Sequence, residues 1–115
     1  TRLVVVLGHS QCGAVAATVR AIEANQSPES RHLRAITDRI RPHLEELVAL
    51  GSTGERQTMM RHAVRANVRA SVVQLRHGSA LLEDYVRSDR LAIVGAELAL
   101  ETGEVDFFDL PNLPA

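Results

Sequence analysis

The sequence has little of several features that mark particular classes of protein. Its single cysteine cannot form an internal disulfide, which favours a reducing, cytoplasmic setting. Aromatic residues make up only 3% of the chain, which argues against a stacking platform for single-stranded nucleic acid. The net charge of −1 gives no electrostatic signature of a nucleic-acid or anionic-membrane partner. No apolar run approaches the roughly 20 residues of a membrane span, and no signal peptide is recognisable.

The length and composition fit one small domain. With 115 residues, of which 45% are hydrophobic and 23% charged, the chain is large enough to bury a core. We therefore expect residues 1–115 to form a single domain. The chain opens on Thr1-Arg2 directly before a strand-like run, without an initiator methionine. We interpret this start as a cut through a larger domain, so that the domain is truncated at its N-terminus.

The spacing of apolar residues predicts strands at both ends of the chain and helices between them. Leu3 to Leu7 are five consecutive aliphatic residues, typical of a strand buried on both faces in a parallel sheet. Two further strands are predicted at 91–100 and 104–108, and the turn residues Thr102-Gly103 between them indicate a β-hairpin. Helical periodicity predicts helices at 13–24, 31–50, 57–76 and 80–86.

The expected fold is therefore α/β, with a mostly parallel sheet flanked by helices and a C-terminal antiparallel hairpin strand. Three strands are few for four helices, so this sheet is expected to need further strands. Pro42 is expected to kink or split its helix. A loop is expected at 51–54 and an irregular tail from Asp109 onwards.

Several polar residues are expected to be structural. Ser79 is positioned to cap the short helix that follows it. Glu97 lies in an otherwise apolar strand and is expected to face solvent. Four histidines are expected at the surface rather than at a metal site, namely His32, His43, His62 and His77.

The turn Gly8-His9-Ser10-Gln11-Cys12-Gly13 carries the strongest chemical signal. It follows a parallel strand, at the sheet edge where open α/β folds bind ligands. The helix that begins near Gly13 directs its positive end at this turn, which favours a thiolate. His9 and Cys12 are spaced so that an imidazole and a thiolate can reach one tetrahedral zinc ion from a single turn. The flanking glycines, Gly8 and Gly13, permit unusual backbone angles and close approach.

The residues alone leave other interpretations of this turn open. Cys12 can be a small buried apolar residue, or a redox-active or catalytic thiol at the start of a helix. His9 can be an ordinary hydrogen-bonded histidine. A zinc site also needs four ligands, or three and a water, so two side chains do not complete one.

Three segments together resemble the second half of a β-class carbonic anhydrase. They are "LVVVLGHSQCGAV", "VRANVRASVVQLR" and "LLEDYVRSDRLAIVGAELALETGEVDFF", which occur in the order and at the spacing of that family. The resemblance implies a β-carbonic-anhydrase-like fold. It also implies a zinc ion held by two cysteines and one histidine, of which His9 and Cys12 match the histidine and the second cysteine. The Cys-x-Asp-x-Arg motif, which carries the first cysteine and an aspartate, is absent from this sequence.

The activity implied by the resemblance is the reversible hydration of carbon dioxide to bicarbonate and a proton. Zinc would lower the pKa of a bound water, Gly13 would lie near the substrate, and neither Ser10 nor Gln11 is given a catalytic role. Homodimers or higher oligomers are also implied. Two interpretations follow: the chain is the zinc-bearing half of an active enzyme and has little or no activity by itself, or it is a non-catalytic regulatory or dimerisation domain.

Overall fold

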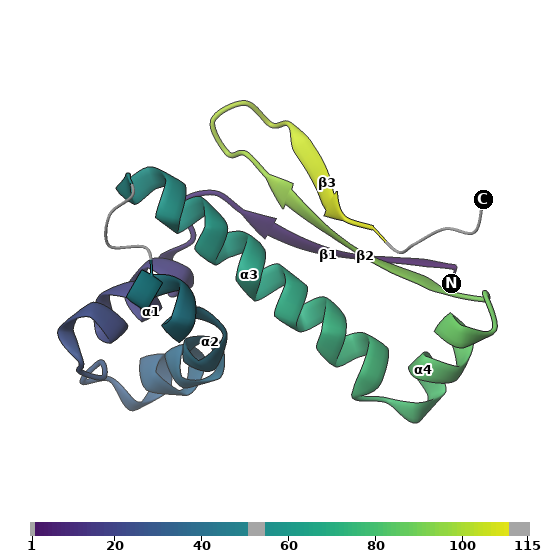
Figure 1. The fold of residues 1–115 in the computed structure, drawn as a ribbon, viewed down its shortest axis with the longest axis horizontal. Helices are drawn as coiled ribbons and strands as arrows, with labels where there is room; N and C mark the ends of the chain where they lie inside the picture. Colours follow the sequence, from purple (N-terminus) through teal and green to yellow (C-terminus); the bar gives the residue numbers. More distant parts are fainter. Residues whose placement is uncertain (1, 51–54, 111–115) are drawn as a thin grey trace. The chain divides into compact units, whose positions relative to one another are not determined.

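The computed structural model describes residues 2–50 and 55–110. They form two compact units (Figure 1), one comprising Thr1–His9 with Val68–Ala115 and the other Ser10–Asn67. The loop expected at 51–54 and the end of the tail at 111–115 lie outside the described residues. Within the described ranges, no helix has the length and apolar character needed to cross a membrane.

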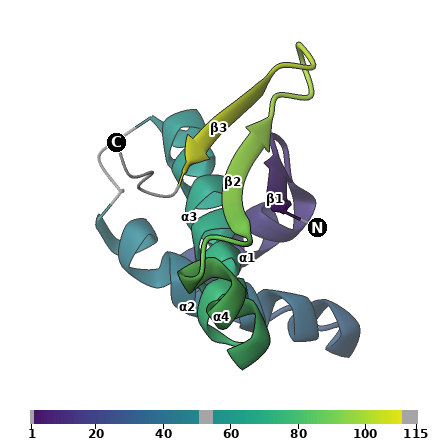
Figure 2. The same ribbon diagram turned by 90° about the vertical axis from the view of Figure 1, so that its right-hand side faces the viewer.

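The first unit is built on a sheet whose described strands are β1 (Leu3–His9), β2 (Ala92–Leu98) and β3 (Val105–Asp109). Figures 1 and 2 show β2 between the other two strands. β1 runs parallel to β2, and β3 returns antiparallel to it. The predicted parallel pairing and the C-terminal hairpin are therefore confirmed.

Two helical segments cover one face of this sheet. α3 (Arg56–His77) begins in the second unit, and its C-terminal part packs through Val68 and Val72 against Ile93 of β2. α4 (Ala80–Arg87) begins at Ser79, whose hydroxyl accepts a hydrogen bond from the Leu82 backbone N–H at 3.3 Å. The predicted helix cap at Ser79 is confirmed.

The strands differ in burial, and two predictions about them are wrong. β1 is not buried on both faces, because its alternate residues Leu3, Val5 and Leu7 are exposed and no described strand pairs with its outer edge. Glu97 does not face solvent but is 8% exposed. It is buried because β2 is the central strand, which places Gly8 of β1 on one side of it and Asp106 of β3 on the other.

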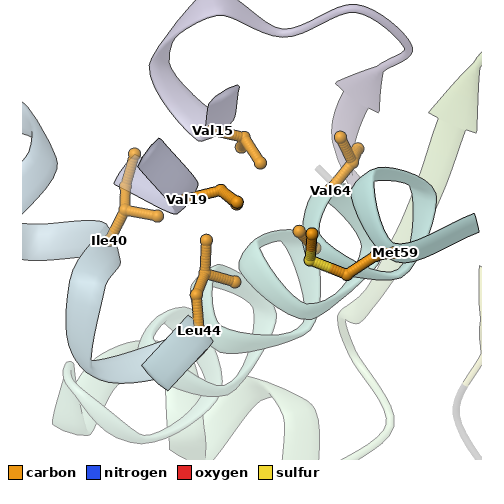
Figure 3. Close-up of a cluster of buried hydrophobic side chains, with 7 residues drawn as sticks. Val15, Val19, Ile40, Leu44, Met59 and Val64 are labelled. Carbon is orange, nitrogen blue, oxygen red and sulfur yellow. The ribbon is translucent and has the colours of Figure 1, made fainter. Parts of the chain in front are cut away.

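The second unit is helical. It contains α1 (Gly13–Ala24), α2 (Arg31–Leu50) and the N-terminal part of α3. Figure 3 shows its core, a cluster made of Val15, Val19, Ile40, Leu44, Met59, Ala63 and Val64. This second-unit core is apolar throughout, so burial of these side chains is what holds the three helical segments together.

Pro42 was expected to kink or split its helix; it does not split it, since α2 is continuous from Arg31 to Leu50, and a kink stays a prediction. A proline leaves the carbonyl four residues earlier, here that of Asp38, without its helical hydrogen bond. Pro42 and Asp38 both lie on the exposed side of α2, where water can satisfy this carbonyl.

Candidate metal centre

His9 is the last residue of β1, at the carboxyl end of the parallel pair formed with β2. It lies opposite Leu98 in the strand register, and its side chain is exposed. In a parallel α/β sheet this end of the strands is the one that binds ligands. The sequence predicted this position correctly.

The two residues after His9 form the turn, and the backbone of Gln11 lies in the left-handed region with φ of 56°. The flanking glycines, Gly8 and Gly13, permit unusual backbone angles but do not have positive φ. Among the described residues, only Gly103 is a glycine with positive φ. Gln11 therefore has the positive φ in this turn, and Cys12 after it is extended.

Cys12 is the N-cap of α1, with φ −72° and ψ 116°. Its carbonyl accepts the first helical hydrogen bond, from the backbone N–H of Ala16 at 2.9 Å. Its side chain makes no capping hydrogen bond, and the thiol is free of any disulfide. The half-buried side chain packs against the second-unit core. This packing agrees with the apolar role of a lone cysteine and leaves the sulfur uncommitted to the helix.

The donor types at this turn fit zinc, but they are too few to complete a site. Imidazole nitrogen and thiolate sulfur are the donors that zinc prefers in proteins. Within residues 2–50 and 55–110, no group of three or more His, Cys, Asp or Glu side chains is arranged to hold a metal ion. His9 and Cys12 therefore provide at most half of a tetrahedral set. Zinc binding by this pair stays a prediction.

The other histidines lie away from any such arrangement. All four are exposed, two of them on α2 and two on α3: His32, His43, His62 and His77. Their surface position is confirmed.

Gly13, the residue expected near the substrate, opens α1 and is exposed. A methyl group built on its Cα would meet no described heavy atom within 4 Å. The space above the first turn of α1 is therefore open, which permits close approach of another group. Contact with a substrate stays a prediction.

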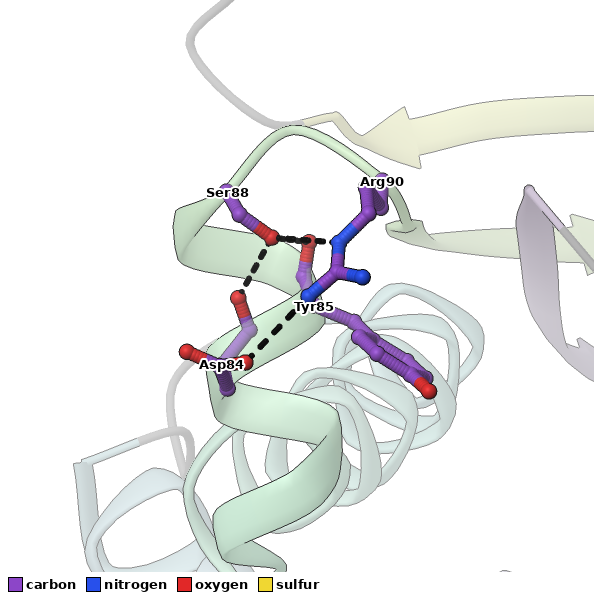
Figure 4. Close-up of polar contacts among 4 residues, drawn as sticks. All are labelled: Asp84, Tyr85, Ser88 and Arg90. Carbon is purple, nitrogen blue, oxygen red and sulfur yellow. Dashed lines mark hydrogen bonds and ion pairs between the residues drawn. The ribbon is translucent and has the colours of Figure 1, made fainter.

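A second polar cluster, at the end of α4, is structural (Figure 4). The Arg90 guanidinium lies over the Tyr85 ring, 4.5 Å from its centre, and donates to Ser88 Oγ at 3.0 Å and to Asp84 Oδ2 at 3.3 Å. Ser88 Oγ in turn donates to the Asp84 carbonyl at 2.8 Å. These contacts satisfy the C-terminal turn of α4 and fix the route of the chain into β2.

Comparison with known proteins identifies similar sequences and folds. The sequence model of the family described as carbonic anhydrase matches residues 1–105. A carbonic anhydrase of Mycolicibacterium smegmatis is 32% identical over 106 residues, which cover 90% of this chain and 48% of that protein.

Solved structures support the same fold. The β-carbonic anhydrase CafA of Aspergillus fumigatus superposes with a TM-score of 0.77 at 20% identity, covering 98% of this chain and 51% of that one. One of two tetrameric β-carbonic anhydrases from Sordaria macrospora superposes with a TM-score of 0.73 at 18% identity, covering 94% and 52%. The chain thus spans about half the length of the relatives that it matches. These likenesses confirm the predicted α/β fold class.

Proposed function

Because the chain belongs to the carbonic anhydrase family, we propose that it is the zinc-bearing second half of a β-carbonic anhydrase, a carbonate dehydratase that interconverts carbon dioxide and bicarbonate. The observation that carries the proposal is the family match over residues 1–105. It includes the turn at 8–13, which lies between the carboxyl end of β1 and the start of α1. The proposed reaction is the reversible hydration of carbon dioxide to bicarbonate and a proton.

In this proposal His9 and Cys12 are two of the zinc ligands. Cys12 binds as a thiolate and therefore releases its proton on coordination. Since its sulfur makes no capping hydrogen bond to α1, no such bond has to break when it binds metal. When bound, zinc supplies a Lewis acid that lets water act as a nucleophile near neutral pH.

Gly13 is proposed to border the substrate. The absence of a side chain leaves open space above the first turn of α1. The positive end of that helix favours the negative charge of bicarbonate over neutral carbon dioxide. Gly13 would thus help bicarbonate to bind and give the substrate access to the site, and it would neither take up nor release a proton.

We also propose that the protein is a cytoplasmic homodimer or higher oligomer with no nucleic-acid or membrane partner. Support for self-association comes from the relatives in Sordaria macrospora, which are tetrameric, and from the exposed apolar side chains of β1. The second candidate function is a non-catalytic regulatory or dimerisation domain. It is favoured by the finding that the described residues bring no third ligand to His9 and Cys12.

The test is zinc content per chain, measured by elemental analysis after equilibration of the purified 115-residue protein with zinc. Wild type should retain weakly bound zinc, and His9→Ala and Cys12→Ser should each weaken binding about tenfold or more. His62→Ala removes an exposed histidine of α3 and is the matched control, which should bind like wild type. Zinc binding that is unchanged in both ligand variants would overturn the assignment of His9 and Cys12.

A further inference from the structure

The two outer edges of the described sheet differ in how well they are protected from pairing with another chain. An edge strand exposes unpaired backbone N–H and C=O groups, and natural edges commonly carry charges, prolines or bulges that prevent further pairing. β3 has two aspartates among its five residues, and its pairing with β2 contains a register shift. β1 has no charged residue and no proline between Leu3 and Gly8, and its pairing with β2 is regular. Of the two described edges, β1 is therefore the one open to a further strand.

The side chains of β1 show what kind of strand fits beside it. Val4 and Val6 pack against the apolar cluster that includes residues of α3 and α4. The alternate residues point to the other face and stay exposed, at 53% for Leu3, 40% for Val5 and 52% for Leu7. Both faces of β1 are thus apolar, so the fitting neighbour is a strand that is apolar on both faces as well.

A second copy of β1 is such a strand. The segment Leu3-Val4-Val5-Val6-Leu7 reads the same in both directions. Antiparallel pairing about Val5 therefore sets Leu3 opposite Leu7, Val4 opposite Val6, and Val5 opposite itself on a two-fold axis. Each contact is then made twice, as in any two-fold interface, and the paired segments bring no like charges opposite each other.

The face of the sheet under the helices leaves room for this pairing. A pocket of about 480 Å³ lies beside Val6, and its walls include Leu75 of α3 and Leu82 of α4. In the antiparallel register, Val4 of the second copy lies opposite Val6 and points to the same face, where this pocket can receive its side chain. Pairing also extends the three described strands into a sheet of six, which is a common size.

We propose that the outer edge of β1 is a docking surface for a second copy of this chain, which pairs with it antiparallel about Val5. The inference deepens the self-association proposed above and requires neither zinc nor catalysis. Because the contact is small, its dissociation constant should be on the order of 10–100 μM. At the low-micromolar concentrations of an unfolding experiment the chain is then mostly monomeric, and the Val5 side chain stays exposed.

Sedimentation equilibrium of the purified 115-residue protein, over about 2–300 μM, measures this dissociation constant. Val5→Lys should raise it about tenfold or more, because two ammonium groups would meet at the two-fold axis. Val105→Lys is the matched control, since it adds the same charge at a similarly exposed valine, 46% against 40%, on β3. Its dissociation constant should stay within about twofold of the wild-type value.

A disulfide experiment tests the register, and it remains decisive if Val5→Lys does not fold. In a Cys12→Ser background, Val5→Cys places two thiols opposite each other with Cα atoms about 4.5–5.5 Å apart, which a disulfide can span. Leu3→Cys is the control, because the register offsets its two copies by four residues, about 13 Å. Mild oxidation should crosslink Val5→Cys but not Leu3→Cys, although Leu3 is the more exposed residue.

The outcomes separate this inference from the proposed function. A chain that stays monomeric up to the highest concentration would overturn the inference and leave the edge of β1 to a strand of another polypeptide. A dimer that Val5→Lys leaves intact would place self-association elsewhere and overturn the inference alone. Crosslinking of Leu3→Cys as readily as of Val5→Cys would exclude the antiparallel register. The zinc assignment is tested apart from this, by His9→Ala, since His9 lies outside the paired segment.

Discussion

Val5 of β1 lies directly opposite Val94 of β2 in the parallel register, yet Val5 is 40% exposed and Val94 only 5%. Side chains opposite each other on neighbouring strands point to the same face of a sheet. The difference therefore reflects position in the sheet, since Val94 lies in the central strand β2, whereas Val5 lies in β1, which has a described strand on one side only. The same residue type is core in one strand and surface in the next.

This difference in burial predicts that valine-to-alanine substitution lowers the free energy of unfolding by different amounts at the two positions. Val94→Ala removes a buried side chain and should lower the free energy of unfolding by about 2 kcal/mol. Val5→Ala should lower it by less than about 1 kcal/mol, because much of that side chain stays in water. Urea denaturation of the two variants measures both values. Equal losses in the free energy of unfolding would show that the Val5 side chain is covered in solution.

The strand pattern shows what the sequence can and cannot predict about this fold. Strands and helices were predictable from apolar spacing because that signal is local. Burial was not, because it depends on which strand is central. Leu3 to Leu7 are as apolar as a doubly buried strand but lie at the edge of the described sheet, whereas the charged Glu97 is buried because β2 is its middle strand.

Catalysis by the chain alone gives a second prediction. The purified 115-residue protein with zinc should not hydrate carbon dioxide faster than buffer does, because two ligands cannot complete the site and the Cys-x-Asp-x-Arg motif is absent. Stopped-flow measurement with a pH indicator tests this, with the Mycolicibacterium smegmatis carbonic anhydrase as positive control. Zinc-dependent hydration that Cys12→Ser abolishes would contradict the prediction.

Substitution of glycine by alanine should have different effects on stability at Gly95 and at Gly13. A methyl group at Gly95 would lie 2.9 Å from Val68 Cγ1 and 3.0 Å from Asp109 Cβ, whereas at Gly13 it would meet nothing within 4 Å. Gly95→Ala should therefore lower the free energy of unfolding by about 1–3 kcal/mol. Gly13→Ala should leave it unchanged or raise it by less than about 1 kcal/mol, since alanine favours a helix. Thermal or urea unfolding distinguishes them, and a large loss in Gly13→Ala would mean that its surroundings are not open.

The end of α4 gives a prediction of increased stability. The backbone N–H of Arg90 donates to the Tyr85 carbonyl at 2.9 Å and that of Asp89 to the Val86 carbonyl at 3.3 Å, with Asp89 left-handed between them at φ 60°. Glycine is the preferred residue at this position of a Schellman motif. Asp89→Gly also removes a negative charge from the negative end of the helix. It should raise the free energy of unfolding by about 0.5 kcal/mol, and a decrease in the urea midpoint would contradict this.

The candidate site was predictable in its residues but not in its backbone. The His-x-x-Cys spacing after a strand located His9 and Cys12, and the structure places them at the end of β1 and the start of α1 as expected. The positive φ of Gln11 was not predicted. Glutamine has no preference for positive φ, so the sequence carries no signal for this backbone conformation.

In the second unit, the Arg56 guanidinium donates two hydrogen bonds to the Glu23 carboxylate, at 2.8 and 2.9 Å, and so joins the end of α1 to the start of α3. These hydrogen bonds lower the pKa of Glu23 below its ordinary value of 4.5, and the charge of Arg56 adds to this effect. A carboxyl whose pKa is lowered on folding stabilises the protein above its unfolded pKa. The stabilisation is lost as the pH falls through the lower, folded value.

Arg56→Gln should therefore be slightly less stable than wild type at neutral pH, and the difference should disappear as the pH falls below 4.5. The effect is small because both side chains are substantially exposed, and high salt should reduce it further. Urea midpoints of the two proteins across this pH range measure it. Arg61→Gln removes another exposed arginine of α3 and should show no such dependence. A stability difference between Arg56→Gln and wild type that grew on acidification would rule out this ion pair as its source.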